Sequence, residues 1–418
     1  MKINKDKFFP VERVLLLAQS DCRVNISTQY LDRVISPNKT VTQAELFFEQ
    51  LGITRVADQT GLDRIGIPCF ATFRPNSKTL ANNQGKGLTK DAARASAVME
   101  AAEFAVAENP SIENLSGNIL ELDNQGHSMV DIRYLLPIGE NIPESKELQW
   151  IPGLNIKTKK DVLIPLDAVS INAENNKLPG ICKSTNGLAS GNCEEEAIFH
   201  GLCELIERDA STLWSLISKK MQTQTIIDPK TWSDEAVDGL FQKVKKAGLE
   251  IKLFDQTSDI GMPCVMAIIG EVEKHEYKHF DLAAGYGAHP NAARAAIRAI
   301  TEAAQTRITS IAGSRDDIIP SEYSQAAASE HVKLLETSII PNRKMTSGIP
   351  LGTSLTELLN NTVTALEKVG INDIFAFPLC GDEFTFSVMK LVIPSLEDRE
   401  ANSNWRPNIR ALEVMLAV

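Results

Sequence analysis

Polar side chains with helical spacing occur in two segments of the chain that are otherwise rich in alanine. Each segment carries a trio at positions i, i+4 and i+7, and these trios are Ser96, Glu100 and Glu103, and Arg298, Glu302 and Gln305. Such positions fall within an arc of about 60° on a helix, so each trio shares one helix face. Taken alone, a charged face of this kind is usually solvated.

A third segment between them carries more acids. It contains Asn192, Glu196, Glu204, Glu207 and Arg208. Around the axis of a helix, the directions of Glu196 and Glu207 would differ by only about 20°. Those of Glu196 and Glu204 would differ by about 80°. The segment therefore predicts a second acidic helix with a guanidinium next to its last acid.

The neighbours of these acids are apolar, which favours burial over solvation. A helix that is apolar nearly all round is expected to be buried, and its acids then need partners. Two carboxylates about 5 Å apart repel by about 3 kcal/mol at an effective dielectric of 20. Mg²⁺ would remove that repulsion, and arginines would bind phosphate oxygens. The three segments together predict a metal-bridged nucleotide.

The standard nucleotide-binding motifs do not account for such a site. Gly85-Lys86-Gly87 lacks the glycine that a P-loop has five positions earlier, because Leu80 stands there. The segment Gly285 to Pro290 is not a dinucleotide fingerprint, because proline replaces the third glycine. A nucleotide held by this chain would rest on the acidic helices instead.

The pattern of the chain predicts a mixed α and β fold. Helices are expected at 43–51, 90–108, 194–218, 234–247, 290–312 and 355–368, and strands at 263–271, 280–286, 373–379 and 386–392. Near the start, Ser36-Pro37-Asn38 indicates a turn. These elements must carry the polar trios, so the site depends on long helices packed against strands.

Composition limits the classes of function. The 418 residues have 43 basic and 54 acidic side chains, so the net charge is 43 − 54 = −11, which disfavours nucleic-acid binding. No stretch is long and apolar enough for a membrane span. The seven cysteines include no CxxC pair, which indicates reduced thiols and a cytoplasmic protein.

The motifs resemble those of the YcaO family. Gly85-Lys86-Gly87 precedes the first trio, Asn186 to Asn192 precedes the middle acids, and the third trio follows, so the resemblance covers about residues 50–310. It implies a single large α/β domain with mixed sheets and buried acidic helices lining an ATP site. Residues 1–75 would be an N-terminal strand and helix segment of the same body, and 76–418 the YcaO domain.

The resemblance also implies roles for individual residues. Nucleotide binding is implied for Ser96, Glu100, Glu103, Asn192, Glu196, Glu204, Glu207, Arg208, Arg298, Glu302 and Gln305. Metal binding is implied for Glu100, Glu103, Glu196, Glu204, Glu207 and Glu302, and a catalytic role for Arg208 and Arg298. The family also brings an N-terminal basic residue and a hydroxyl to the phosphates, for which Arg33 and Thr40 are candidates that no motif fixes.

In function, the resemblance implies ATP- and Mg²⁺-dependent activation of a peptide backbone amide through O-phosphorylation. The segments Gly52 to Asp58 and Thr60 to Pro68 resemble the branch that works with a TfuA partner and forms thioamides. The C-terminal segment Leu412 to Val418 lacks the proline-rich tail typical of azoline-forming members. Thioamide formation is therefore the leading expectation.

Two other functions stay open. The protein could be a cyclodehydratase that forms azolines on Cys, Ser or Thr of a precursor peptide, or a non-catalytic ATP-binding accessory factor. Residues 1–40 are too few for a separate peptide-recognition domain, so a TfuA-like partner or another leader-binding protein is expected to present the peptide substrate. The resemblance alone also implies a homodimer.

Overall fold

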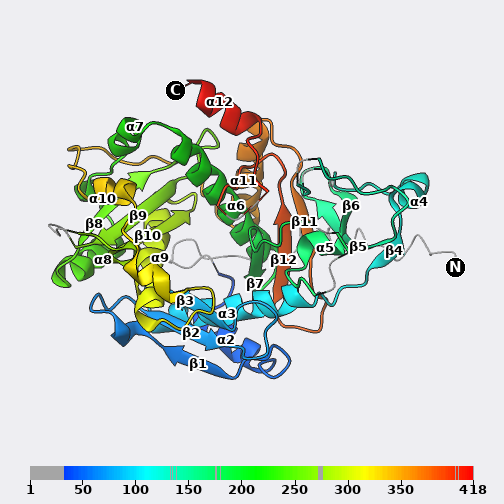
Figure 1. Cartoon of the computed structure of the whole chain (residues 1–418), viewed down its shortest axis with the longest axis horizontal. Coiled ribbons are helices and arrows are strands. Elements are labelled where there is room, and N and C mark those ends of the chain that lie inside the picture. The colour runs from blue at the N-terminus through cyan, green and yellow to red at the C-terminus, as the bar shows by residue number, and fades with distance from the viewer. Residues whose placement is uncertain are drawn as a thin grey trace. The chain divides into compact units, whose positions relative to one another are not determined.

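The fold is mixed α/β, as the sequence predicts (Figure 1). A computed structural model describes residues 33–131, 133, 135–137, 139–174, 177–178, 180–271, 276–400, 402 and 404–417. Contacts within the chain define two compact units. Unit 1 comprises 33–35, Ala102–Leu205 and Gly352–Arg406, and unit 2 comprises Ser36–Ala101, Ile206–Leu351 and Pro407 onward.

Unit 1 is built on one six-stranded sheet. Its strands follow the order β4 (Leu115–Gly117), β5 (Leu148–Asn155), β11 (Phe375–Pro378), β12 (Ser387–Val392) and β7 (Leu188–Gly191), and β6 (Lys160–Pro165) also pairs with β5. Among the described residues, the helices that lie wholly in this unit are α4 (Ile119–Asn124), α5 (Leu166–Val169) and α11 (Leu355–Lys368). Ser354 caps α11 by accepting a hydrogen bond from the Glu357 N–H.

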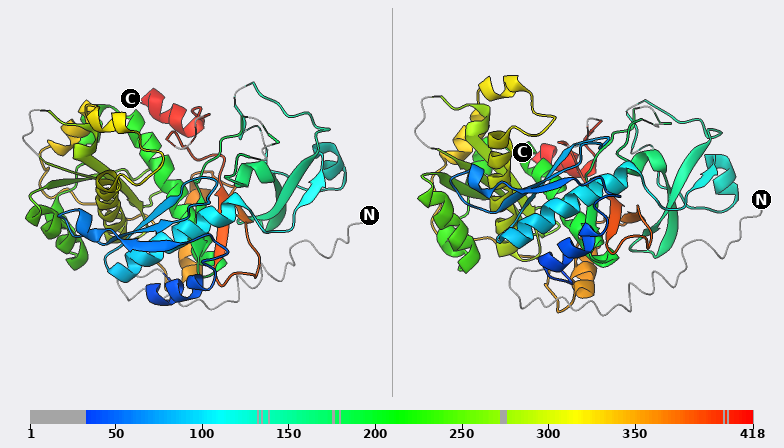
Figure 2. Two further views of the ribbon diagram at one scale, coloured as in Figure 1. Left: turned by 60° about the horizontal axis from the view of Figure 1, so that its bottom comes forward. Right: turned by 90° about the horizontal axis from the view of Figure 1, so that it is seen from below.

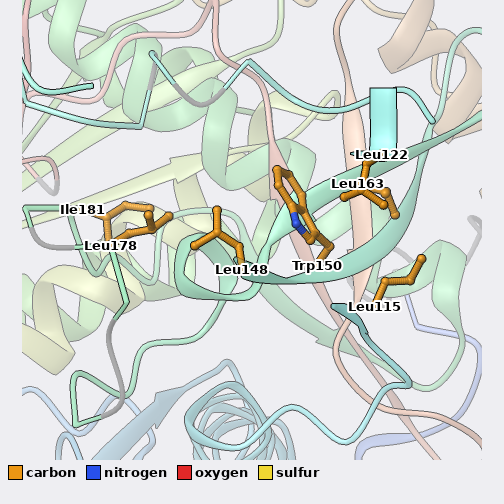
Figure 3. Close-up of a cluster of buried hydrophobic side chains, with 7 residues drawn as sticks. All are labelled: Leu115, Leu122, Leu148, Trp150, Leu163, Leu178 and Ile181. Atoms are coloured by element: carbon orange, nitrogen blue, oxygen red, sulfur yellow. The ribbon is translucent and has the colours of Figure 1, made fainter. Parts of the chain in front are cut away.

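A compact apolar cluster fills one part of unit 1 (Figure 3). Its buried members are Leu115, Leu122, Leu148, Trp150, Leu163, Leu178 and Ile181. Trp150 is fully buried, and its indole N–H donates to the Gly117 carbonyl oxygen at 2.9 Å, so the ring loses no hydrogen bond on burial. Strands β4 and β5 are fixed to each other at this point.

Unit 2 contains two three-stranded sheets. One consists of β1 (Arg55–Asp58), β2 (Cys69–Phe73) and β3 (Asn82–Lys86), and the other of β8 (Glu250–Asp255), β9 (Cys264–Gly270) and β10 (Leu282–Ala288). Helix α9 (Ala292–Ala312) packs on β9 and β10 and also contacts β2 and β3 (Figure 2). Asn291 caps α9 at its start, and Gly313 in the left-handed conformation ends it.

The other helices of unit 2 surround these sheets. They are α2 (Pro37–Glu45), α7 (Lys219–Gln224), α8 (Glu235–Lys246), α10 (Ser329–Leu335) and α12 (Ile409–Ala417). Two long helices belong to both units: α3 (Lys90–Glu108) begins in unit 2 and ends in unit 1, and α6 (Glu194–Leu216) does the reverse. The polar residues on these two helices are therefore divided between the units.

Most predicted elements are confirmed, two expectations are wrong, and five strands, β4 to β8, are missing from the predicted set. The helix expected at 43–51 lies at Pro37–Glu45, because Pro37 occupies its first turn and Ser36 precedes it as the N-cap residue. The sheets are not mixed: every pair of the named strands is antiparallel, which suits the short connections between strands such as β5 and β6. Strands β4 to β8 were not expected, because β4 is short and Pro152 and Gly153 weaken the strand pattern of β5.

Two expectations from composition can be compared with the structure. Within the described residues, every helix is too short or too polar to span a bilayer. In the same part of the chain, no disulfide joins any of Cys69, Cys182, Cys193, Cys203, Cys264 and Cys380. The boundary expected near residue 75 stays a prediction, and residues 1–32 of that N-terminal segment lie outside the described residues.

Candidate functional site

Four elements of unit 2 bring together a group of charged side chains, which we call the unit 2 cluster. Its members are Lys86, Glu100, Glu207, Arg208, Arg298 and Glu302. They come from the end of β3, from α3, from α6 and from α9. Lys86 and Glu302 form an ion pair in which the Nζ and Oε2 atoms are 2.5 Å apart. Residues more than 200 positions apart in sequence therefore form one polar site.

Glycines on the strands allow α3 and α9 to approach closely enough to form this cluster. A Cβ atom at Gly85 would lie 2.0 Å from the Ala97 backbone nitrogen on α3. A Cβ atom at Gly285 on β10 would lie 2.2 Å from the Ala303 backbone nitrogen on α9. Only glycine fits at such strand and helix contacts. The backbones of α3 and α9 thus lie directly on the two strands, and Glu100 and Glu302 are partly buried on these helices.

Burial makes Glu100 an unusually weak acid. Removal from water raises the pKa of Glu100 to about 7, and the charges of Lys86 and Arg315 oppose that rise. A hydrogen bond from the Gln84 backbone N–H also favours the ionised form. Near neutral pH the Glu100 carboxyl group can therefore gain or lose a proton, and a bound cation would favour its ionised form.

Glu207 and Glu302 influence each other. Burial raises the pKa of Glu207, and the charge of Glu302 raises it further against the opposing charge of Arg208. Burial alone would also raise the pKa of Glu302, but Lys86 and Arg208 outweigh it and lower that pKa. The positive charges of the unit 2 cluster thus keep Glu302 ionised. Repulsion between the two carboxylates makes Glu207 harder to ionise.

Unit 1 contains a second set of the predicted site residues. Glu103 accepts hydrogen bonds from the backbone N–H and the hydroxyl of Ser190, at 2.8 and 2.7 Å. Glu196, which is 2% exposed, accepts from Arg33 Nη1 at 2.8 Å, from the Val34 N–H and from the Asn192 amide. Glu103 is therefore held by strand β7. Glu196 is held by residues 33–34 and by Asn192, which lies between β7 and α6.

Glu204 faces a buried lysine in the same unit. Burial lowers the pKa of Lys390 to about 8, while the charges of Glu204 and Asp398 act in the opposite direction. Lys390 Nζ donates to the carbonyl oxygens of Ser184 and Asn186 at 2.6 and 2.7 Å. The lysine fixes the segment that leads into β7 and α6, and it supplies a positive charge for Glu204.

The eleven predicted nucleotide-binding residues are thus distributed over both units. Unit 2 holds Ser96, Glu100, Glu207, Arg208, Arg298, Glu302 and Gln305, and unit 1 holds Glu103, Asn192, Glu196 and Glu204. Sequence reasoning assigned no role to Lys86 or Lys390, and it named Arg33 without a motif. The signal for Lys86 lies in Gly85-Lys86-Gly87, a motif that carries the family resemblance without giving Lys86 a role. Thr40 lies within α2 and is buried there.

The unit 2 cluster has donors that suit Mg²⁺. Mg²⁺ usually takes one or two carboxylates and completes its shell with water and substrate phosphates. Glu100, Glu207 and Glu302 supply carboxylates, and the side-chain oxygen of Gln305 is buried without a hydrogen-bond partner in the described structure. Across that same part of the chain, no three Asp, Glu, His or Cys side chains form a ready-made metal cage. The six individual metal ligands stay a prediction.

The chain resembles proteins of known structure over most of its length. The YcaO protein of Methanopyrus kandleri, solved with AMPPCP and Mg²⁺, superposes with a TM-score of 0.69 at 22% identity, covering 90% of this chain and 95% of that one. A heterocyclase in complex with substrate and cofactor gives a TM-score of 0.71 at 16% identity, covering 88% of this chain and 53% of that one. The shared fold is the YcaO fold.

Sequence comparison gives the same family. A protein from the tfuA 3′ region of Rhizobium leguminosarum bv. trifolii is 34% identical over 384 residues, covering 88% of this chain and 90% of that protein. A Methanothermobacter thermautotrophicus protein is 33% identical over 375 residues, covering 87% of this chain and 95% of its own. The model of the YcaO cyclodehydratases, which bind ATP and Mg²⁺, matches residues 84–397. This chain therefore belongs to the YcaO family of ATP- and Mg²⁺-dependent peptide-modifying enzymes.

Proposed function

We propose that this enzyme converts a peptide backbone amide into a thioamide and that it acts with a TfuA-type partner. The observation that carries this proposal is the 34% identity, over 88% of the chain, to a protein from a tfuA 3′ region. The segments Gly52 to Asp58 and Thr60 to Pro68 support it, since they resemble the TfuA-associated branch. The TfuA-type partner would present the peptide substrate to the enzyme.

The proposed reaction exchanges oxygen for sulfur at one carbonyl carbon. Hydrosulfide adds to the carbonyl carbon, the resulting oxyanion takes the γ-phosphoryl group of ATP, which leaves ADP, and the sulfur atom gives up its proton to solvent. Inorganic phosphate then departs with that oxygen, and a carbon–sulfur double bond forms. Such phosphoryl transfer requires positioning and charge neutralisation more than covalent participation of the protein.

The unit 2 cluster supplies groups suited to this task. Arg208 and Arg298 would neutralise the transferring phosphoryl group, because guanidinium groups donate to two phosphate oxygens at once. Glu207 and Glu302 would hold Mg²⁺, which when bound neutralises phosphate charge. In unit 1, Glu196 is held by Asn192 and Arg33, and it stays a predicted cation-binding acid. The acids thus serve cation binding, and the arginines serve the phosphates.

Azoline formation is the second candidate, and the description of the matching family as cyclodehydratases favours it. In that reaction a Cys, Ser or Thr side chain of the peptide attacks the preceding carbonyl carbon, and the oxygen again leaves as phosphate. The same ATP chemistry serves both outcomes, so only the nucleophile separates them.

Mass spectrometry of the peptide product separates these functions. The purified enzyme is incubated with ATP, Mg²⁺, sulfide, a TfuA-type protein and peptides encoded beside its gene. A mass gain corresponding to sulfur in place of oxygen supports thioamidation, whereas loss of one water supports azoline formation. ATP consumption with an unchanged peptide would contradict both and leave an ATP-binding accessory role.

Two variants connect the product to the site. Glu302→Gln should abolish the mass change and ATP turnover, because it removes a carboxylate from the unit 2 cluster. Glu330→Gln is the matched control, since Glu330 pairs with Lys219 on an exposed part of unit 2 and should retain activity. Equal product from Glu302→Gln and the parent would remove Glu302 from the site. Omission of the TfuA-type protein should reduce thioamide formation more than it reduces ATP hydrolysis.

A further inference from the structure

Lys86 is the residue of the unit 2 cluster to which the predicted chemistry assigns no role. It is the last residue of β3, and its backbone is fixed by pairing with Cys69 on β2. Its side chain is 26% exposed, and its Nζ lies 2.5 Å from Glu302 Oε2. A strand therefore directs a positive charge onto an acid of the candidate site.

The charge of Lys86 acts on all three acids of the cluster. It favours the ionised forms of Glu100, Glu207 and Glu302. An ammonium group is a compact point charge with three donors, and it carries no acceptor atom. The Lys86 ammonium group, which is attached to β3, carries a single positive charge and binds carboxylate oxygens. In both respects it resembles a monovalent cation.

The contacts of Glu302 leave no room for a second cation between it and Lys86. Glu302 Oε1 accepts the Tyr286 backbone N–H at 3.3 Å, and Oε2 accepts Lys86 Nζ. Mg²⁺ binds carboxylate oxygens at about 2.0–2.1 Å. An ion at that distance on the line from Oε2 to Nζ would overlap the ammonium group. Lys86 must move away before a metal ion can take its place.

We propose that Lys86 is a positioning residue that occupies the cation position of Glu302 in the nucleotide-free protein and is displaced when a divalent cation binds there. This inference rests on the proposed function only in treating Glu302 as a metal-binding acid. Lys86 pairs with Glu302 before the metal arrives. The cost of displacing Lys86 lowers the affinity for metal alone.

Metal binding without nucleotide tests this inference. Mn²⁺ is titrated into chelator-treated, full-length protein and followed by electron paramagnetic resonance, with thermal melting of the metal-free protein as the second readout. Lys86→Met should tighten Mn²⁺ binding by about tenfold or more, because a positive charge no longer repels the ion at short range. The same variant should melt several degrees lower without metal, since the three acids lose a shared counter-charge.

Two other variants sharpen the test. Lys90→Met is the matched control, because Lys90 pairs with Asp58 at the surface and is 67% exposed, so its Mn²⁺ affinity should equal that of the parent. Lys86→Arg keeps the charge and can bind Glu302 through two hydrogen bonds, so Mn²⁺ should bind no more tightly than to the parent. If Lys86→Met fails to fold, Lys86→Arg and Lys86→Gln provide the same comparison.

The outcomes are separate from those of the thioamidation assay. Equal Mn²⁺ affinities for Lys86→Met and the parent would overturn the displacement of Lys86, whatever the peptide product is. A parent protein that binds no Mn²⁺ would overturn it as well. Tighter Mn²⁺ binding in Lys86→Met, with an unchanged peptide in the mass assay, would support the role of Lys86 and contradict thioamidation alone.

Discussion

Arg410 on helix α12 forms a bidentate salt bridge with Asp209, the residue that follows Arg208 on α6. The Arg410 Nε and Nη2 atoms lie 3.0 and 2.8 Å from the two carboxylate oxygens of Asp209. Asp209 is fully buried, and Arg410 is only 8% exposed. The guanidinium also reaches Asp259 at 2.7 Å, on a side chain that is 58% exposed. A buried ion pair thus joins α12 to the turn of α6 that carries Glu207 and Arg208.

Replacement of Arg410 should destabilise the protein strongly. Arg410→Leu leaves the Asp209 carboxylate buried without its counter-charge, and loss of one partner of a buried pair costs about 3–5 kcal/mol. Urea denaturation of the two proteins measures the difference. Asp259→Asn is the control, because an exposed partner contributes about 1 kcal/mol or less. A similar small loss in both variants would show that the buried pair is not a main source of stability.

Two glycine substitutions test the close packing of β3 on α3. In Gly85→Ala the new Cβ would lie 2.0 Å from the Ala97 backbone nitrogen, so β3 and α3 must separate, at a cost of about 3 kcal/mol or more. Gly239 lies inside α8 with nothing within 4 Å of its Cβ position, so Gly239→Ala should add up to about 1 kcal/mol. Chemical denaturation should give opposite signs. Equal effects would contradict the role of Gly85 as a contact residue.

Local patterns predicted the acidic helices well. Helix α3 begins at Lys90 and ends at Glu108, as expected, because an uninterrupted run of alanine and other helix formers specifies it without help from distant residues. Helix α11 also has its expected bounds, since Ser354 is a strong N-cap residue. Glu196 and Glu207 are buried, as their apolar neighbours predict, whereas Glu100, Glu103, Glu204 and Glu302 are partly buried.

Partners that lie far apart in the sequence could not be predicted in this way. Lys86 and Glu302 are 216 positions apart, and Lys390 is 206 positions from Ser184. Nothing near Lys86 in the sequence indicates that an acid of α9 will face it. The pairing arises from two strand and helix contacts, at Gly85 and at Gly285, and each depends on tertiary packing. The acids were therefore predictable, and the lysine that neutralises them was not.

Glu100 should make stability depend on pH. Because burial raises its pKa from 4.5 to about 7, the folded protein holds this proton more tightly than the unfolded chain does. The resulting stabilisation is fully present below about pH 4.5 and is lost as the pH rises to about 7. Glu100→Gln has no carboxyl group to titrate at this position. The free energy of unfolding of the variant, relative to that of the parent, should therefore increase as the pH rises from 4.5 to about 7. Urea midpoints measured across that range give the comparison.

A surface acid supplies a control of opposite sign. The hydrogen bond from Lys219 lowers the pKa of Glu330, so its small contribution is present above the ordinary pKa of 4.5 and is lost as the pH falls. Glu330→Gln should therefore weaken the protein slightly at neutral pH and have no effect in acid. A Glu100→Gln profile parallel to that of the parent from pH 4.5 to 7 would show that Glu100 titrates normally.

Binding of Mg²⁺-ATP should raise the melting temperature through Arg298. A ligand that binds only the folded state at 100 times its dissociation constant adds about 2.7 kcal/mol of stability. Arg298→Ala removes one of the two guanidinium groups that act on Glu207. It should change the melting temperature of the ligand-free protein only slightly. It should reduce the increase in melting temperature produced by Mg²⁺-ATP far more. Arg94→Ala is the control, since Arg94 pairs with Glu45 outside the cluster. Equal Mg²⁺-ATP shifts in Arg298→Ala and Arg94→Ala would exclude Arg298 from phosphate binding, because a guanidinium that contacts the triphosphate cannot be removed without a loss of affinity.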